Sequence, residues 1–161
     1  MLYNALIVSG NSFTYYNDLP SLVSEMALAD GLEYEYDSHL EGGWSWERHA
    51  ASQLTMDKIR QDRWDVVILQ EYSTRPAYPD EELCRQTLPY LDQLVAAVME
   101  NNPETVIQFY LTWGRPGGET ELCKTMPQFC SYVSYQVGGS MLTFSGWNSS
   151  PHFRMLSHVD T

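Results

Sequence analysis

Residues 65–70 read DVVILQ, a continuous run of apolar and β-branched side chains that ends in a glutamine. Such a run is typical of a strand buried on both faces of a sheet. Residues 2–9 (LYNALIVS) and 105–112 (TVIQFYLT) show the same pattern. Residues 32–39 (LEYEYDSH) alternate and carry acidic side chains. We therefore expect four strands, the second of them partly exposed.

Segments with helical spacing lie between and after these strands. They comprise residues 18–29, 47–61, 80–101 and 119–136. Asp18 is the expected N-cap of the first helix. Strands that alternate with helices favour a parallel sheet with helices on both faces, so the predicted fold class is α/β.

The composition limits the classes of function. The 161 residues suffice for one domain, and the 43% hydrophobic content argues against disorder. Nine Lys and Arg oppose 21 Asp and Glu, which gives a net charge of −12. Nucleic acids and anionic membrane surfaces both require clustered basic side chains, so neither is an expected partner. The sequence does not predict an oligomeric state.

The cysteines and histidines indicate neither a disulfide framework nor a metal site. Cys84, Cys123 and Cys130 form no CxxC pair, and no His, Cys and Asp set has metal-ligand spacing. We expect no cofactor and no metal. No apolar run reaches the length of a membrane span, and residues 1–8 are too short for the apolar core of a signal peptide and lack a basic segment. A cytoplasmic location is therefore expected.

The character of the sequence changes near residue 137. Residues 138–161 contain no Glu and no Lys, and they show neither helical nor strand periodicity. We therefore expect a domain over residues 1–136 and an irregular, divergent tail over residues 137–161.

Polar residues follow each predicted strand, and the carboxyl ends of parallel strands are where sites form in open α/β sheets. Ser12 follows Gly10 at the turn after the first strand. Its hydroxyl would be exposed, with backbone N–H groups nearby, as a nucleophile requires. An ordinary N-cap or loop serine fits the same spacing. From the residues alone, both interpretations stay open.

The segment LIVSGNSFTYYNDLP (residues 6–20) resembles the first block of the SGNH/GDSL-type hydrolases, in a GNSFT variant. EGGWSWERH and VVILQEYSTRP resemble the second and third blocks. The resemblance implies a three-layer, flavodoxin-like α/β/α sandwich and ester hydrolysis through an acyl-enzyme. It implies Ser12 as the nucleophile and Gly43, or else Gly42, as an oxyanion-hole donor. Gln70 stands where the family generally has Asn, and its side chain can donate the same N–H.

YLTWGRPGG (residues 110–118) resembles a further family element that lines the ligand site. Asn11, Trp113 and Arg115 are the expected substrate-binding residues, and a small ester or an acetylated carbohydrate is the expected ligand. Arg75 also follows a strand, and a salt bridge is its more ordinary role. Glu71 could be a catalytic carboxylate, although an acid at a strand end is more often solvated or paired.

The family's general base lies in an Asp-x-x-His element, and this sequence contains no acid-x-x-His. The histidines are His39, His49, His152 and His158, and the residues three positions before them are Tyr36, Trp46, Ser149 and Met155. A serine is a poor nucleophile without a base. We considered His49, His152 and His158 as substitutes, and none has a carboxylate at the family spacing.

Three hypotheses follow. The chain is an esterase with an unrecognised base, or it is a catalytically inactive homologue that binds a ligand in the same place. Alternatively it is a truncated, spliced or frame-shifted product without a function of its own, because the absent Asp-x-x-His and the changed tail point to one cause.

Overall fold

Five parallel strands form one sheet in the order β2-β1-β3-β4-β5. The structure is a computed structural model that describes residues 2–111 and 140–143. The described elements are, in chain order, β1 (Leu2–Gly10), α1 (Ser12–Tyr15), α2 (Leu19–Ala29), β2 (Glu33–Leu40), α3 (Trp46–Ala51), α4 (Gln53–Arg60), β3 (Val66–Leu69), the 3-10 helix η1 (Arg75–Ala77), α5 (Asp80–Gln86), α6 (Leu88–Asn101), β4 (Val106–Leu111) and β5 (Ser140–Thr143). The predicted α/β class and parallel sheet are confirmed.

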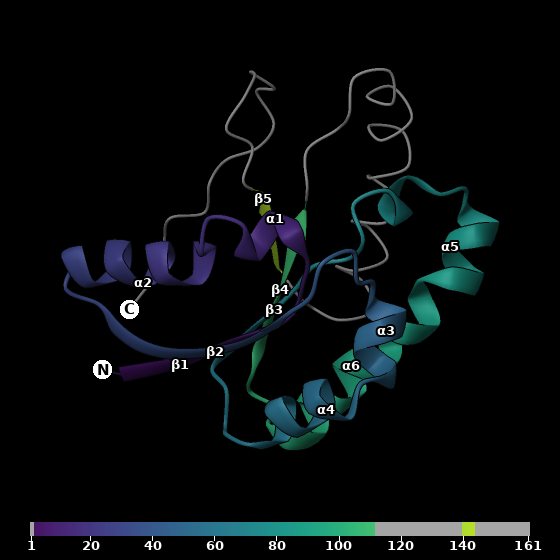
Figure 1. Cartoon of the computed structure of the whole chain (residues 1–161). Helices are drawn as coiled ribbons and strands as arrows, with labels where there is room; N and C mark the ends of the chain where they lie inside the picture. Colours follow the sequence, from purple (N-terminus) through teal and green to yellow (C-terminus); the bar gives the residue numbers. More distant parts are fainter. Residues whose placement is uncertain (1, 112–139, 144–161) are drawn as a thin grey trace.

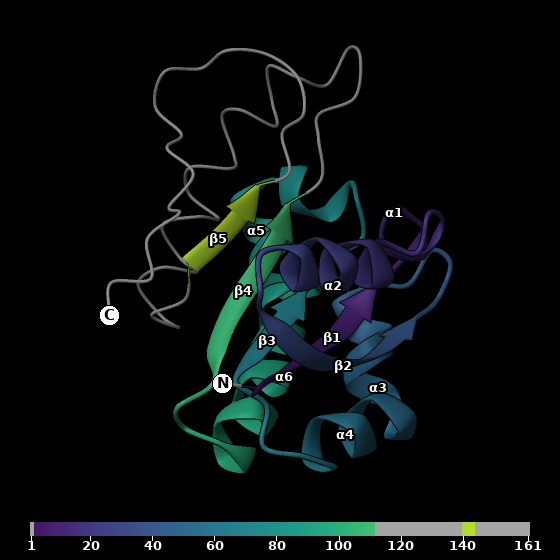
Figure 2. The same ribbon diagram turned by 90° about the vertical axis from the view of Figure 1, so that its left-hand side faces the viewer.

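Helices cover both faces of the sheet, as a three-layer sandwich requires. Figure 1 shows α1 and α2 on one side and α3, α4 and α6 on the other. In the perpendicular view of Figure 2, α2 crosses in front of the strands, with α4 and α6 behind them.

The register aligns the carboxyl ends of the three strands on which the candidate site depends. Gly10 of β1 pairs with Leu40 of β2, and Ser9 pairs with Leu69 of β3. Because the strands are parallel, the segments that follow them leave the sheet at one edge. Residues 11–14, 41–45 and 70–73 are therefore neighbours.

The main core lies between the sheet and the layer of α3, α4 and α6. Its fully buried members include Trp46, Ile59, Leu69, Leu91, Leu94 and Ile107. In the opposite layer, Pro20 is the buried residue of α2.

Two predicted helices are each divided in two. The expected helix over residues 47–61 ends at Ala51, where Ser52 adopts an extended backbone and accepts a hydrogen bond from Thr55 N to cap α4. The expected helix over residues 80–101 breaks at Thr87, because Pro89 fits only the first turn of a new helix. Asp18 occupies the N-cap position of α2, but its side chain makes no capping bond there.

The segment expected to be an irregular tail contains a strand. Residues 140–143 pair with residues 108–111 of β4, so these four residues extend the sheet. Backbone pairing does not require the periodicity that the sequence lacks. The expected helix over residues 119–136, the domain boundary and the rest of the tail lie outside the described residues.

None of the helices in the described ranges has the length and apolar character needed to cross a bilayer.

The core assignment predicts a large difference between two leucines. Leu91 is 0% exposed and Leu28 is 63% exposed. We expect Leu91→Ala to reduce the free energy of unfolding by about 2–5 kcal/mol, because it leaves a cavity. Leu28→Ala is the matched control and should change it by less than about 0.5 kcal/mol. Urea unfolding of both variants measures this, and equal losses would contradict the assigned core.

Candidate functional site

Ser12 lies at the first turn after β1 and is the first residue of α1. Its side chain is exposed, whereas Asn11 and Thr14 on either side of it are buried. The Asn11 side chain caps α1 by accepting a hydrogen bond from Phe13 N at 3.3 Å. Gly10, before this turn, packs closely against β2: a Cβ on it would stand 2.2 Å from Leu40 Cδ2. The backbone thus presents the Ser12 hydroxyl to solvent.

Gln70 joins the end of β3 to the Ser12 turn. It is 1% exposed, and its Oε1 accepts hydrogen bonds from Asn11 N at 3.0 Å and from the Thr14 hydroxyl at 2.5 Å. A backbone N–H can only donate, so Oε1 is the atom at this position and Nε2 is the donor of the amide. Gln70 therefore fixes the turn before and after Ser12.

The Gly43 turn lies beside the same strand ends. Glu41 N donates to the Gly10 carbonyl at 3.0 Å, and Trp44 N closes the turn on the Glu41 carbonyl. Gly43 has a φ of 71°, a left-handed conformation that favours glycine. A Cβ on Gly42 would lie 2.9 Å from the Tyr15 hydroxyl, so this turn reaches α1.

Glu71 is a buried carboxyl group directly after Gln70. Its Oε1 accepts from Trp46 N at 3.1 Å and from Tyr72 N at 2.5 Å, and its backbone carbonyl accepts from Asn11 Nδ2 at 3.3 Å. Oε2 is buried without a hydrogen-bond partner among the described residues. Burial raises the pKa of Glu71 to about 7, against the lowering effect of the two N–H donors and of Arg75.

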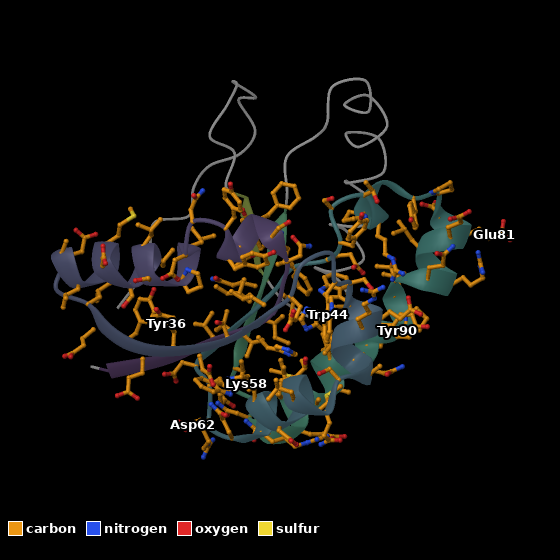
Figure 3. The ribbon with its side chains drawn as sticks, in the orientation of Figure 1. Tyr36, Trp44, Lys58, Asp62, Glu81 and Tyr90 are labelled. Atoms are coloured by element: carbon orange, nitrogen blue, oxygen red, sulfur yellow. The ribbon has the colours of Figure 1, made fainter. Side chains whose placement is uncertain are left out.

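Two buried histidines lie behind the Gly43 turn. Nδ1 of His39 is 2.7 Å and Nδ1 of His49 is 3.2 Å from the Thr55 hydroxyl, which they share. The Trp44 ring meets both imidazoles edge to face, with centroids 5.3 and 5.0 Å away. Figure 3 shows Trp44 where the loop after β2 meets α3. Burial lowers the pKa of His49 to about 4, so this ring is neutral at pH 7.

No protein-family model and no curated protein matches the sequence. Solved structures match the fold. The family 3 carbohydrate esterase of Clostridium thermocellum superposes with a TM-score of 0.63 at 12% identity, over 93% of this chain and 82% of that chain. TesA gives 0.60 at 10% identity, over 86% and 76%. The psychrotrophic esterase EstA of Pseudoalteromonas gives 0.56 at 10% identity, over 88% and 76%.

The chain has the fold of the SGNH/GDSL-type hydrolases. The resemblance of the three sequence blocks to this family and the superposition of the fold agree. The structure brings the three predicted blocks of the SGNH-type fold to one edge of the sheet, with Ser12, Gly43 and Gln70 on adjoining segments.

The other predicted site residues have different outcomes. Asn11 is expected to bind substrate, but it is buried and both groups of its side-chain amide already bond within the protein, which fits a structural role. Trp113 and Arg115 lie outside the described residues, as do His152 and His158. His49 is 0% exposed, and its Nδ1 is hydrogen-bonded with the Thr55 hydroxyl.

Arg75 makes the predicted salt bridge. Its Nη2 is 2.7 Å from Glu47 Oε2, and its Nη1 donates to the Gln86 carbonyl. The pair joins η1 to α3 and leaves the guanidinium engaged within the protein. Trp46, at the start of α3, is 1% exposed and belongs to the core. Within the described ranges, no three His, Cys, Asp or Glu side chains are placed to hold a metal ion.

Sequence reasoning missed the roles of Thr14, Thr55 and Glu71. Glu71 is expected to be solvated or paired, and it is buried instead, with its Oε1 accepting a hydrogen bond from Trp46 N, 25 residues away in sequence. The sequence feature that could have indicated this burial is the position of the acid, directly after the apolar run of residues 66–69 and Gln70.

The two buried titratable groups predict opposite pH dependences of stability. His49 has a folded pKa of about 4, below its usual 6.5, so its contribution is present above pH 6.5 and is lost as the pH falls towards 4. Glu71 has a folded pKa of about 7, above its usual 4.5, so its contribution is present below pH 4.5 and is lost as the pH rises towards 7. Between pH 4.5 and 6.5 the two slopes therefore oppose each other.

Glu71→Gln removes the opposing titration, so the pH dependence of the free energy of unfolding should then follow His49. The free energy of unfolding should then rise by about 2 kcal/mol from pH 4.5 to 6.5, with a slope of at most about 1.4 kcal/mol per pH unit. The lowered pKa of His39 adds in the same direction. His49→Gln is the matched variant, and its free energy of unfolding should instead fall as the pH rises. Denaturant unfolding across this pH range measures both, and slopes of the same sign would contradict the assignment.

Proposed function

We propose that this chain is an SGNH-type serine ester hydrolase, and that Ser12 is its nucleophile. The observation that supports this most strongly is the Ser12 turn. An exposed serine hydroxyl stands directly after β1, on a backbone that Gln70 holds through Asn11 N and the Thr14 hydroxyl. A turn held on both sides of its serine is the preorganised element that nucleophilic catalysis requires.

The reaction would proceed through an acyl-enzyme. Ser12 Oγ attacks the ester carbonyl, the alcohol leaves with a proton, and water then hydrolyses the acyl-serine. The backbone N–H groups of Ser12 and Gly43 and the Gln70 Nε2 would bind the oxyanion of the tetrahedral intermediate. Donors of this kind lower the barrier because they are already oriented where negative charge develops.

The substrate that we propose is a small ester, with an acetylated carbohydrate as the leading case. Two structures with this fold are named as carbohydrate esterases, of families 3 and 2, both from Clostridium thermocellum. Another is the periplasmic domain of a lipopolysaccharide acetyltransferase of Salmonella. Their identities to this chain are 10–17%, so they suggest a class of ester and not a particular compound.

The lack of an identified general base lowers the catalytic rate that we expect. These 161 residues contain no acid-x-x-His, and the two described histidines are buried against Thr55. Loss of a triad member costs about 10⁴–10⁶ in kcat and leaves catalysis by the oxyanion hole and binding. A polypeptide of this sequence should therefore acylate slowly. The same observation favours a second candidate function, a ligand-binding homologue without turnover.

Covalent labelling separates these two candidates without requiring fast turnover. We expect a fluorophosphonate to add one phosphonyl group to the peptide that contains Ser12, because the reagent reports on the nucleophile and its oxyanion donors. Mass spectrometry of the digested protein identifies the site. Slow release of p-nitrophenol from p-nitrophenyl acetate should accompany it.

The controls are two serine variants. Ser12→Ala should lose both the label and the release of p-nitrophenol, whereas Ser24→Ala, on α2 and half-buried, should keep both. If folded wild-type protein and Ser12→Ala release p-nitrophenol at equal rates and take up no label, the hydrolase proposal is wrong and the binding candidate remains.

A further inference from the structure

Glu71 links the three segments that carry the proposed catalytic groups. Through its backbone carbonyl it accepts from the Asn11 side chain, next to Ser12. Through Oε1 it accepts from Trp46 N, at the end of the loop that contains Gly43. It follows Gln70 directly in the chain. Glu71 is thus linked to the Ser12 turn and to the Gly43 loop by hydrogen bonds, and to Gln70 by the chain itself.

The position of this carboxyl group is energetically costly. Glu71 is 3% exposed, and Oε2 has no hydrogen-bond partner among the described residues. Arg75 is the cation nearby that favours the charged form, but it is ion-paired with Glu47, whose charge acts in the opposite direction. A buried carboxylate so weakly compensated reduces stability, and an apolar side chain of similar size would avoid that cost.

An apolar side chain, however, would remove the oxygen that accepts hydrogen bonds from Trp46 N and Tyr72 N. Trp46 N is at the first residue of α3, where a helix has no internal partner for its N–H groups, and Ser45 makes no side-chain cap. Tyr72 N follows Glu71 itself. The carboxyl group therefore sets the distance between the start of α3, and with it the Gly43 turn, and the end of β3, where Gln70 stands.

We propose that Glu71 is a positioning residue of the Ser12 site, which sets the spacing between the Gly43 turn and Gln70 and so the fit of the oxyanion donors. This inference rests on the proposed hydrolase function. Glu71 does not touch the ester: it acts through Trp46 N on one side and through Asn11 on the other. A displacement of about 1 Å in such a group costs about 10²-fold in rate.

The ionisation of Glu71 makes this role observable. An ionised acceptor forms shorter and stronger hydrogen bonds with N–H donors than a neutral one. The pKa of Glu71 is about 7, so the Trp46 N–Glu71 link should strengthen as the pH rises through neutrality. The charged side chains that face Glu71 are Arg75 and Glu47, both carried by segments packed against it.

The test is the rate of the first acylation of Ser12, measured on the full chain from pH 5.5 to 8.5. Phosphonylation followed by mass spectrometry gives this rate even when turnover is slow. We expect a rise with a midpoint near pH 7 in the wild type. Glu71→Gln keeps an acceptor for the two N–H groups but cannot ionise, so it should lose this rise and fall about 10²-fold at pH 8. The saturation constant for p-nitrophenyl acetate should stay within about threefold of the wild type, since Glu71 does not contact the substrate.

Glu47→Gln is the matched control. It removes the neighbouring carboxylate, which makes no hydrogen bond to Trp46 N, and it releases Arg75 from its ion pair. We expect the midpoint to move to lower pH with an unchanged rate at high pH. Glu71→Asp, one methylene shorter, should keep a pH-dependent rise but at a reduced rate, and thermal unfolding establishes that each variant is folded.

The outcomes separate this inference from the function on which it rests. If Ser12 is labelled in the wild type and Glu71→Gln shows the same rate and pH profile, the positioning role is overturned while the hydrolase proposal stands. If Ser12 is not labelled in the wild type, both are overturned. A loss of rate in Glu71→Gln without loss of the pH-dependent rise would also overturn the inference, because a purely structural effect predicts it.

Discussion

The hydrogen bond from Asn11 N to Gln70 Oε1 is the contact on which the rest of the site depends. It joins the residue after β1 to the residue after β3, which are adjacent only because those strands pair in parallel. The Thr14 hydroxyl binds the same oxygen, so one side chain determines the path of the chain around Ser12. Without this contact, the exposed hydroxyl would be a serine on a short, four-residue helix. With it, the nucleophile candidate has a fixed backbone.

The second half of the site is built from the loop after β2. Glu41 N binds the Gly10 carbonyl, and the Trp44 ring packs against His39 and His49, which share the Thr55 hydroxyl. Behind this cluster lies the core between the sheet and α3, α4 and α6 (Figure 1). The edge of the sheet that carries Ser12 is thus supported from one side by apolar packing. The opposite layer is formed by α1 and α2, in which Thr14 and Pro20 are buried.

The site contains two titratable groups, Glu71 and His49, whose burial disfavours their charged forms. At pH 7 the carboxyl group of Glu71 is near half ionisation and His49 is neutral, and each makes hydrogen bonds within the site. Such groups reduce stability in opposite pH ranges, and in exchange they define distances that apolar contacts leave variable. This is the arrangement expected where geometry matters more than stability.

The sequence by itself determined the α/β class, the parallel strands and the three blocks around Ser12, Gly43 and Gln70, because the strand periodicity and the order of the motifs are local properties. It also placed Arg75 in a salt bridge, since acids are abundant. Only the tertiary structure decided that Asn11 turns inward, that His49 is buried against Thr55, and that Glu71 is buried. Each of these depends on partners 6 to 60 residues away in sequence or on packing between layers, which no local pattern encodes.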